Sequence, residues 1–160
     1  MLDFEVSKVE PCEILVLRHH MPCYVGQFLE VAPRASALHV VAKTLLQVGT
    51  ASPKALARAA ELLTQFDLPK TLRQLCLIAF SGDQQQRVNL ACGFGYGYLA
   101  QLLDGPTAGL DGTNRDVLLE MNLDVKASGD VIIGSFGCEA VWQRVCDHCV
   151  DVTCFLRSVA

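Results

Sequence analysis

The run of residues 80–111 constrains the fold of this chain more than any other part of the sequence. Ser81-Gly82 precedes Asp83-Gln84-Gln85-Gln86-Arg87, a pattern that predicts a helix N-cap followed by a first turn carrying an acid. Leu102-Leu103-Asp104 is a short apolar run ending in an acid, which is typical of a buried parallel strand whose carboxyl end faces a ligand. The run therefore predicts an α/β domain.

Four motifs in this run, taken in order, resemble those of the ATP-binding-cassette (ABC) ATPases. Phe80-Ser81-Gly82-Asp83-Gln84 stands at that family's LSGGQ signature, and residues 99–104 stand at its Walker B strand. Pro106-Thr107 follows, and Ala108-Gly109-Leu110-Asp111 matches the D-loop. The resemblance implies an incomplete P-loop NTPase-like sheet that binds Mg-ATP. The nucleotide contacts it implies are Ser81, Gly82, Gln84, Asp104 and Asp111.

The resemblance covers roughly residues 13–152. Gln27 stands at the Q-loop glutamine, which in the family reaches toward the metal and the attacking water, so Gln27 and Asp104 are the implied Mg²⁺ and catalytic residues. Residues 28–49 resemble the helical subdomain of the ATP-binding proteins of the bacterial phosphonate C–P lyase system. That similarity implies a C–P lyase-type protein partner for the subdomain.

Three positions and one motif depart from the family. Gly105 replaces the catalytic Glu, Asp83 replaces the second Gly of the signature, and Gly137 stands where the switch His is expected. The P-loop pattern G-x-x-x-x-G-K-[ST] is absent from the 160 residues, and this loop supplies most phosphate contacts. We therefore expect a truncated, degenerate ATPase that binds Mg-ATP weakly and hydrolyses it poorly by itself.

At 160 residues the chain is long enough for one domain with a real core. We expect N-terminal strands up to the Q-loop in residues 1–28, a helical subdomain in 29–80, and a C-terminal α/β part in 81–160. Strands are predicted at residues 4–9, 13–17, 22–28, 99–104, 130–136 (a buried strand) and 150–155. A helix is predicted at residues 36–49 with Ser36 as N-cap, and another at residues 52–66 with Ser52 as cap and a buried stripe that includes Leu56. Further helices are predicted at residues 72–78, 82–92, 114–126 and 139–149, and a glycine-rich turn at residues 93–97.

Composition excludes several classes of function. A net charge of −4 gives no basic footprint for nucleic acid. The N-terminal stretch MLDFEVSKVEPCEILVL carries acids and no basic region, so it is not a signal peptide, and no apolar run reaches the roughly 18 residues of a membrane span. Eight cysteines without a secretion signal indicate reduced thiols and a cytoplasmic protein.

Two groups of cysteine and histidine residues have spacings that suit a metal ion. Cys146 and Cys149 form a C-x-x-C pair with His148 between them, and Cys138 and Cys154 lie nearby. A structural zinc site needs a second ligand pair, and this pair falls on a predicted helix, so scattered core thiols remain the simpler explanation. The group Cys12, His19, His20 and Cys23 is a weaker zinc candidate.

Two further functions stay open. Gly134-Ser135-Phe136-Gly137 between a strand and a helix is the context of a hydrolase nucleophile elbow, with Ser135 or Cys138 as nucleophile and His148 as base. The chain can also be a non-catalytic protein-interaction module. Because the missing P-loop strand would leave Val131-Ile132-Ile133 at an open sheet edge, we expect a homo-oligomer.

Overall fold

The computed structural model describes residues 10–12, 22–27, 29, 34–95 and 97–152. The strands predicted at residues 4–9 and 13–17 lie outside this set, as do residues 153–155 of the last predicted strand. The structure is α/β with a parallel sheet and flanking helices, so the predicted fold class is confirmed.

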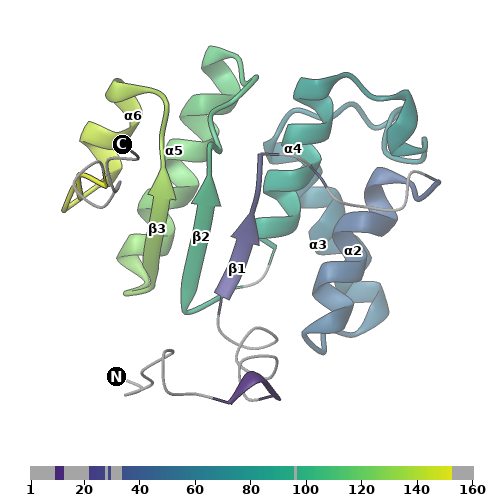
Figure 1. Ribbon diagram of the computed structural model, residues 1–160. Helices are drawn as coiled ribbons and strands as arrows, with labels where there is room; N and C mark the ends of the chain where they lie inside the picture. The colour runs from purple at the N-terminus through teal and green to yellow at the C-terminus, as the bar shows by residue number, and fades with distance from the viewer. Residues whose placement is uncertain (1–9, 13–21, 28, 30–33, 96, 153–160) are drawn as a thin grey trace, which may run out of the picture.

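Three parallel strands form the sheet in the order β1-β2-β3 (Figure 1). They are β1 (Pro22–Val25), β2 (Ala100–Asp104) and β3 (Val131–Ser135). Tyr24, Leu102 and Ile133 share one row across the sheet, and Asp104 pairs with Ser135. All three carboxyl ends therefore meet at one edge, where open parallel sheets bind their ligands.

Helices cover one face of this sheet, and further helices lie beside its two edges. Helix α4 (Gly82–Gly93) packs on β1, and α5 (Gly112–Ala127) packs on β3. The helical hairpin of α2 (Ala37–Gln47) and α3 (Ser52–Gln65) packs against α4, beside β1 in Figure 1. Helix α6 (Glu139–Val145) contacts α5 at the opposite side.

One continuous apolar core joins the hairpin, α4 and the covered face of the sheet. Its fully buried members include Phe66, Leu63 and Leu45 from the hairpin, Leu90 from α4 and Val25 from β1. Gly93, the last residue of α4, lies so close to β1 that a Cβ there would be 2.2 Å from Cγ2 of Val25. The sequence predicts that this glycine belongs to the turn after the helix, whereas it is the last residue of α4 and allows the helix to approach the strand.

The helical predictions hold for α2, α4 and α5 and need correction elsewhere. Ser36 and Ser81 are the expected N-caps. The predicted cap Ser52 is instead the first residue of α3, and Leu56 of its predicted buried stripe is 36% exposed. In place of the helix at residues 72–78 there are turns and a short 3-10 segment, η2 (Leu77–Ala79). Helix α6 ends at Val145, short of the predicted residue 149.

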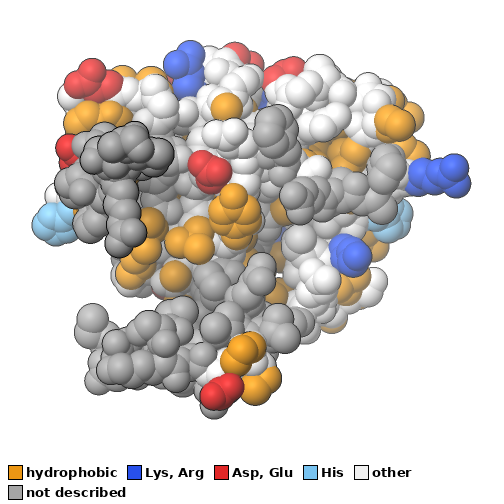
Figure 2. Space-filling model, viewed as in Figure 1, with side chains coloured by type: hydrophobic (Ala, Val, Ile, Leu, Met, Phe, Trp, Pro, Cys, Tyr) orange, Lys and Arg blue, Asp and Glu red, His pale blue; other side chains and the backbone are white. Residues whose placement is uncertain are grey.

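Strand β3 was predicted to be buried, and this prediction is wrong. Val131 is 55% exposed and Ile133 is 64% exposed, as is their neighbour Tyr24 on β1 at 65%. Within the described residues β3 is an edge strand, Val150 and Val152 belong to no strand, and no helix covers this second face. Figure 2 shows hydrophobic side chains gathered on this face.

Candidate functional site

A cavity of about 370 Å³ lies at the carboxyl edge of the sheet. It is lined by residues that follow all three strands: Gln27, Gly105, Thr107, Ala108, Ser135, Phe136 and Gly137. The alternation of side chains along parallel strands, together with the register of β2 and β3, brings these separate segments to one place. Of the residues predicted from sequence, Gln27, Gly105, Ser135 and Gly137 are thus brought together.

Asp104 is linked to this site by a hydrogen bond with Ser135. The hydroxyl of Ser135 donates to Oδ1 of Asp104 at 2.9 Å, and the amide of Gly105 donates to Oγ of Ser135 at 3.0 Å. The Gly105 amide also lies 3.1 Å from the carbonyl oxygen of Ser135, which continues the β2–β3 pairing beyond the strand. The carboxylate is therefore fixed in orientation by the neighbouring strand.

The side chain of Gln27 lies against Gly105. A Cβ built on Gly105 would be 3.1 Å from both Cγ and Nε2 of Gln27, and Gly105 has φ +58°, a conformation that glycine adopts without steric cost. The amide side chain of Gln27 thus fills the space into which a larger residue at position 105 would extend. The sequence predicted both residues separately, and only the fold shows that they are in contact.

Helix α4 holds the two loops of the site through buried amide side chains that sequence reasoning missed. Nδ2 of Asn89 donates to the carbonyl oxygen of Gly26 at 2.7 Å, and Nε2 of Gln86 donates to that of Pro106 at 3.4 Å. Asn89 also donates to Oε1 of Gln86 at 3.3 Å. Polar residues spaced i, i+3 on the buried side of an amphipathic helix were the available signal.

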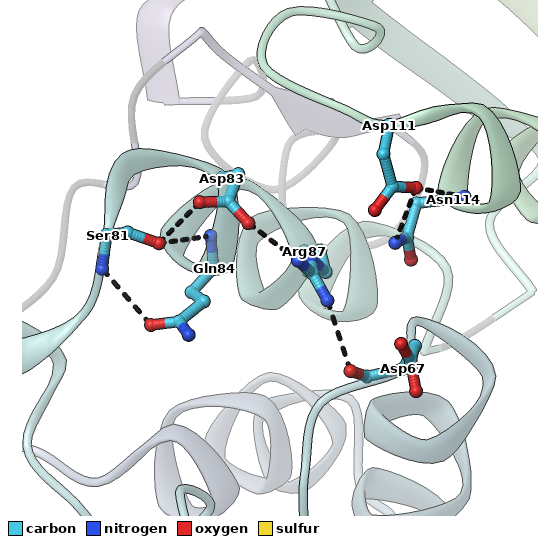
Figure 3. A network of polar contacts seen from close by, with 7 residues as sticks. All are labelled: Asp67, Ser81, Asp83, Gln84, Arg87, Asp111 and Asn114. Carbon is cyan, nitrogen blue, oxygen red and sulfur yellow. Dashed lines mark hydrogen bonds and ion pairs between the residues drawn. The ribbon is translucent and has the colours of Figure 1, made fainter.

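The start of α4 is a second polar site, outside the cavity (Figure 3). Ser81 and Gln84 form a capping box: Oγ of Ser81 accepts from the Gln84 amide, and Oε1 of Gln84 accepts from the Ser81 amide at 3.1 Å. The Ser81 hydroxyl also donates to Oδ1 of Asp83. Gly82, the third implied contact here, is the first residue of the helix.

Asp83 forms an ion pair with Arg87 one turn further along α4, with Nη2 and Oδ2 2.6 Å apart. Nη1 of Arg87 donates to the carbonyl oxygen of Asp67, which has a positive φ of 49°. The hydrogen bond from Ser81 is the main cause that holds the pKa of Asp83 below its usual value, with Arg87 adding to it against a partial cost of burial. Asp83 is therefore ionised at neutral pH.

Asp111 is the N-cap of α5 and faces the same region (Figure 3). Its Oδ1 accepts from the backbone amide of Asn114 at 2.8 Å and from Nδ2 of that residue at 3.0 Å. These bonds lower the pKa of Asp111. The predicted D-loop residue thus has a local capping role in this structure.

The residues present fit a magnesium ion and phosphate oxygens in part. Asp104, Ser135 and Thr107 bring carboxylate and hydroxyl oxygens to one edge of the sheet, and Mg²⁺ prefers oxygen ligands. A bound magnesium ion would neutralise phosphate charge there, and Gln27 would present an amide to it. The assignment of Gln27 and Asp104 to this role stays a prediction.

The zinc hypothesis gains no geometric support. Within the part of the chain that the structure describes, no three His, Cys, Asp or Glu side chains are grouped so that they could hold a metal ion. Burial raises the pKa of the Cys146 thiol and raises that of Cys23 to about 11, which disfavours the thiolate that binds zinc. His19 and His20 lie outside the described residues. Zinc at Cys146 and Cys149 stays a prediction.

The hydrolase hypothesis is not supported by the contacts of Ser135 either. Its hydroxyl donates to Asp104, and among the described residues no hydrogen bond joins it to His148. Cys138, the alternative nucleophile, precedes α6 and is half-buried. A nucleophilic serine needs a base within hydrogen-bond reach. The hypothesis stays untested.

The sheet order, the helical hairpin and the cavity at the carboxyl edge define an ABC-type ATPase cassette fold. Solved structures confirm this. A dimeric post-hydrolysis state of the ATP-binding cassette MJ0796 with ADP and Pi has a TM-score of 0.79 at 20% identity and matches 91% of this chain and 64% of its own. Another dimeric structure of MJ0796, a bacterial ABC transporter cassette, gives 0.78 at 21% identity, with 88% and 62% matched.

Curated sequences show that this chain is a homologue of ABC-type ATP-binding proteins. It is 34% identical over 110 residues to a probable export ATP-binding/permease protein of Pseudomonas fluorescens. It is 28% identical over 129 residues to the lipoprotein-releasing system ATP-binding protein LolD of Aquifex aeolicus. The matches cover 69% and 81% of this chain but 17% and 57% of those relatives. No family model matches.

These relatives act in export and lipoprotein release, according to their names, and none of the matches supports the phosphonate C–P lyase type. Among the helices that the structure describes, none combines the length and the apolar character needed to cross a membrane.

Proposed function

We propose that this chain is an ABC-type ATP-binding protein whose nucleotide site is weak in hydrolysis. One observation carries the proposal: Gln27, Gly105 and Ser135 line the cavity at the carboxyl edge of the sheet, and the Ser135 hydroxyl binds the Asp104 carboxylate. In this site Asp104 would hold the magnesium ion and Ser135 would orient Asp104. The cytoplasm is the compartment that fits this function.

The weakness in hydrolysis follows from the side chains at two positions. Gly105 offers no carboxylate to act as general base for an attacking water, and Gln27 fills the adjacent space. Phe136 and Gly137 also line the cavity, and neither has a side chain that could donate a hydrogen bond to a phosphate. Gly137 stands at the position where the resemblance places the switch histidine, so the cavity has no polar side chain there.

Binding of nucleotide by this 160-residue polypeptide should also be weak, because it contains no P-loop sequence. We expect a dissociation constant for Mg-ATP above roughly 1 mM, which corresponds to a binding free energy weaker than about −4 kcal/mol. Isothermal titration calorimetry with Mg-ATP tests this value. A dissociation constant near 10 μM would show that another part of the chain binds the phosphates.

The location of the site is tested separately by nuclear magnetic resonance. Mg-ATP at roughly 10 mM, well above that limit, should shift the amide signals of Gln27, Gly105 and Ser135, and Asp104→Asn should abolish these shifts by removing the metal ligand. Asp124→Asn is a matched control, since Asp124 is an exposed acid on α5. Absence of shifts in the wild type, or shifts unaffected by Asp104→Asn, would overturn the proposal.

The phosphonate C–P lyase type remains a finer hypothesis that rests only on the resemblance of residues 28–49. Binding of a C–P lyase-type partner protein to the purified chain would support it. Capture of partner proteins from the export or lipoprotein-releasing systems in the same assay would favour the transporter type of the relatives instead.

Self-association is the assembly we propose. The exposed side chains of Tyr24, Val131 and Ile133 form an apolar face on a parallel sheet, and such sheets are usually covered on both faces. Light scattering should show a mass above the 17.4 kDa of one chain at tens of micromolar, and Ile133→Lys should reduce it. A wild-type monomer under these conditions would refute the proposal.

A further inference from the structure

The network at the start of α4 contains an anion of its own. Asp83 receives the Ser81 hydroxyl on one oxygen and Arg87 on the other, so both carboxylate oxygens have partners (Figure 3). A carboxylate that accepts charge-assisted hydrogen bonds at a helix start does what a bound anion would do there. The resemblance places a glycine at this position, so the carboxylate is a property of this chain.

The groups that would bind an external phosphate at this place are already engaged. The Ser81 hydroxyl is used by Asp83 and by the Gln84 amide. Arg87 is only 14% exposed, and its guanidinium is divided between Asp83 and the carbonyl oxygen of Asp67. A phosphate would have to break the Asp83–Arg87 pair and approach a fixed negative charge, which is unfavourable.

A second negative charge borders the same region. Gly109 packs beside Asp83, since a Cβ on Gly109 would be 3.9 Å from Cα of Asp83. The bonds from Asn114 lower the pKa of Asp111 and the charge of Arg87 adds to this, while the nearby charge of Asp83 raises it by a smaller amount. Asp83 and Asp111 thus both border the start of α4 on the side of the loop after β2.

We propose that Asp83 is a specificity-determining residue: its carboxylate occupies Ser81 and Arg87 and excludes phosphate groups from the start of α4. The inference rests on the proposed nucleotide function for its biological meaning. It predicts that the start of α4 contributes nothing to phosphate binding in the wild type. It also predicts that removal of one side chain is enough to create affinity for phosphate.

The experiment uses the ¹⁵N-labelled 160-residue protein and metal-free inorganic tripolyphosphate at constant ionic strength. The amide signals of residues 82–85 report binding at the start of α4. In the wild type these signals should not shift at millimolar probe. In Asp83→Gly and Asp83→Asn they should shift, with a dissociation constant lower by at least about tenfold, since the opposing charge is removed and Arg87 is released.

Asp116→Asn is the matched control, because Asp116 is an exposed acid on α5 and its substitution changes net charge by the same amount. It should behave as the wild type. Asp83→Asn keeps the side-chain size, so it decides the matter if Asp83→Gly does not fold. A gain in either Asp83 variant supports the inference. Overturning results are equal binding by the wild type, or no gain in a folded Asp83→Asn.

Because the probe is inorganic and needs no magnesium, this result is independent of the cavity at Asp104. A gain of tripolyphosphate binding in the Asp83 variants, with no Mg-ATP effect at Gln27 or Ser135, would leave the inference standing and remove the proposed function. If Mg-ATP shifted the signals of Gln27 and Ser135 while the Asp83 variants gained no tripolyphosphate binding, the proposed function would stand and the inference would be overturned.

Discussion

Gln27 and Gly105, which are 78 positions apart in the sequence, lie in contact at the carboxyl edge of the sheet, where a Cβ on Gly105 would be 3.1 Å from Nε2 of Gln27. Gly105 also has φ +58°. A side chain at this position therefore meets two separate costs: a left-handed backbone conformation and a close contact with Gln27.

Gly105→Glu should lower the free energy of unfolding by roughly 2–4 kcal/mol and should not create ATPase activity.

Gly129→Ala separates the two costs, because Gly129 also has a positive φ, of 85°, with nothing within 4 Å of the added Cβ. It should cost about 1–2 kcal/mol in urea unfolding. In the double variant Gln27→Ala/Gly105→Glu, part of the loss should return. Phosphate release by Gly105→Glu well above background would contradict the proposed weakness of the site.

The Asp83 carboxylate should make stability depend on pH in the acid range. Its pKa is lower in the folded protein than the ordinary value of 3.8, so its stabilising contribution is complete above that value and is lost as pH falls through the lower folded pKa. Relative to Asp83→Asn, the wild type should be more stable by about 0.3–1 kcal/mol at pH 7.

This difference should shrink toward zero when urea unfolding is repeated at decreasing pH below 4. Acids that do not interact with Asp83 are common to both proteins and cancel in the comparison. A difference that stays constant from pH 7 to the acid limit would show that the Asp83 charge is not engaged.

Arg73 should be the most important charged residue for the helical hairpin. It is buried; Nε and Nη2 donate to the carbonyl oxygen of Leu68 at 3.0 and 2.8 Å, and Nη1 donates to that of Ala60 at 3.0 Å. Arg73→Met would remove both guanidinium donors of the Leu68 carbonyl group and one donor of the Ala60 carbonyl group, which keeps the Thr64 hydroxyl at 2.7 Å, so we expect a loss of about 2–4 kcal/mol in denaturant unfolding. Arg58→Met, which removes an exposed ion pair with Glu61, should change stability by less than about 0.5 kcal/mol. Similar losses in both variants would refute this role of Arg73.

Asn122 on α5 should be replaceable with a gain in stability. It is fully buried, and among the described residues neither Oδ1 nor Nδ2 has a hydrogen-bond partner. Asn122→Leu removes the cost of burying two unpaired polar atoms, so thermal and urea unfolding should show no loss or a gain of about 1–2 kcal/mol. Leu118→Asn, one turn earlier on the same buried face, should instead destabilise the protein. A marked loss in Asn122→Leu would point to a polar partner, such as a buried water molecule.

The sequence by itself determined the local elements and their order. The caps Ser36 and Ser81 were recognisable because a short polar side chain before a helical pattern satisfies free backbone amides. The strand ending at Asp104 was recognisable from its apolar run. These features depend on neighbours within a few residues, so the chain order is sufficient to predict them.

Only the tertiary structure decided which distant groups meet. The contact of Gln27 with Gly105, the bond of Ser135 to Asp104 and the bond of Asn89 to Gly26 depend on strand order and on how closely α4 approaches β1. The apolar run at residues 131–133 predicted β3 as buried, yet burial depends on what covers a strand, and in the described structure one face of β3 has no covering layer. Local pattern fixes the type of an element, whereas its environment is set by elements far away in the chain.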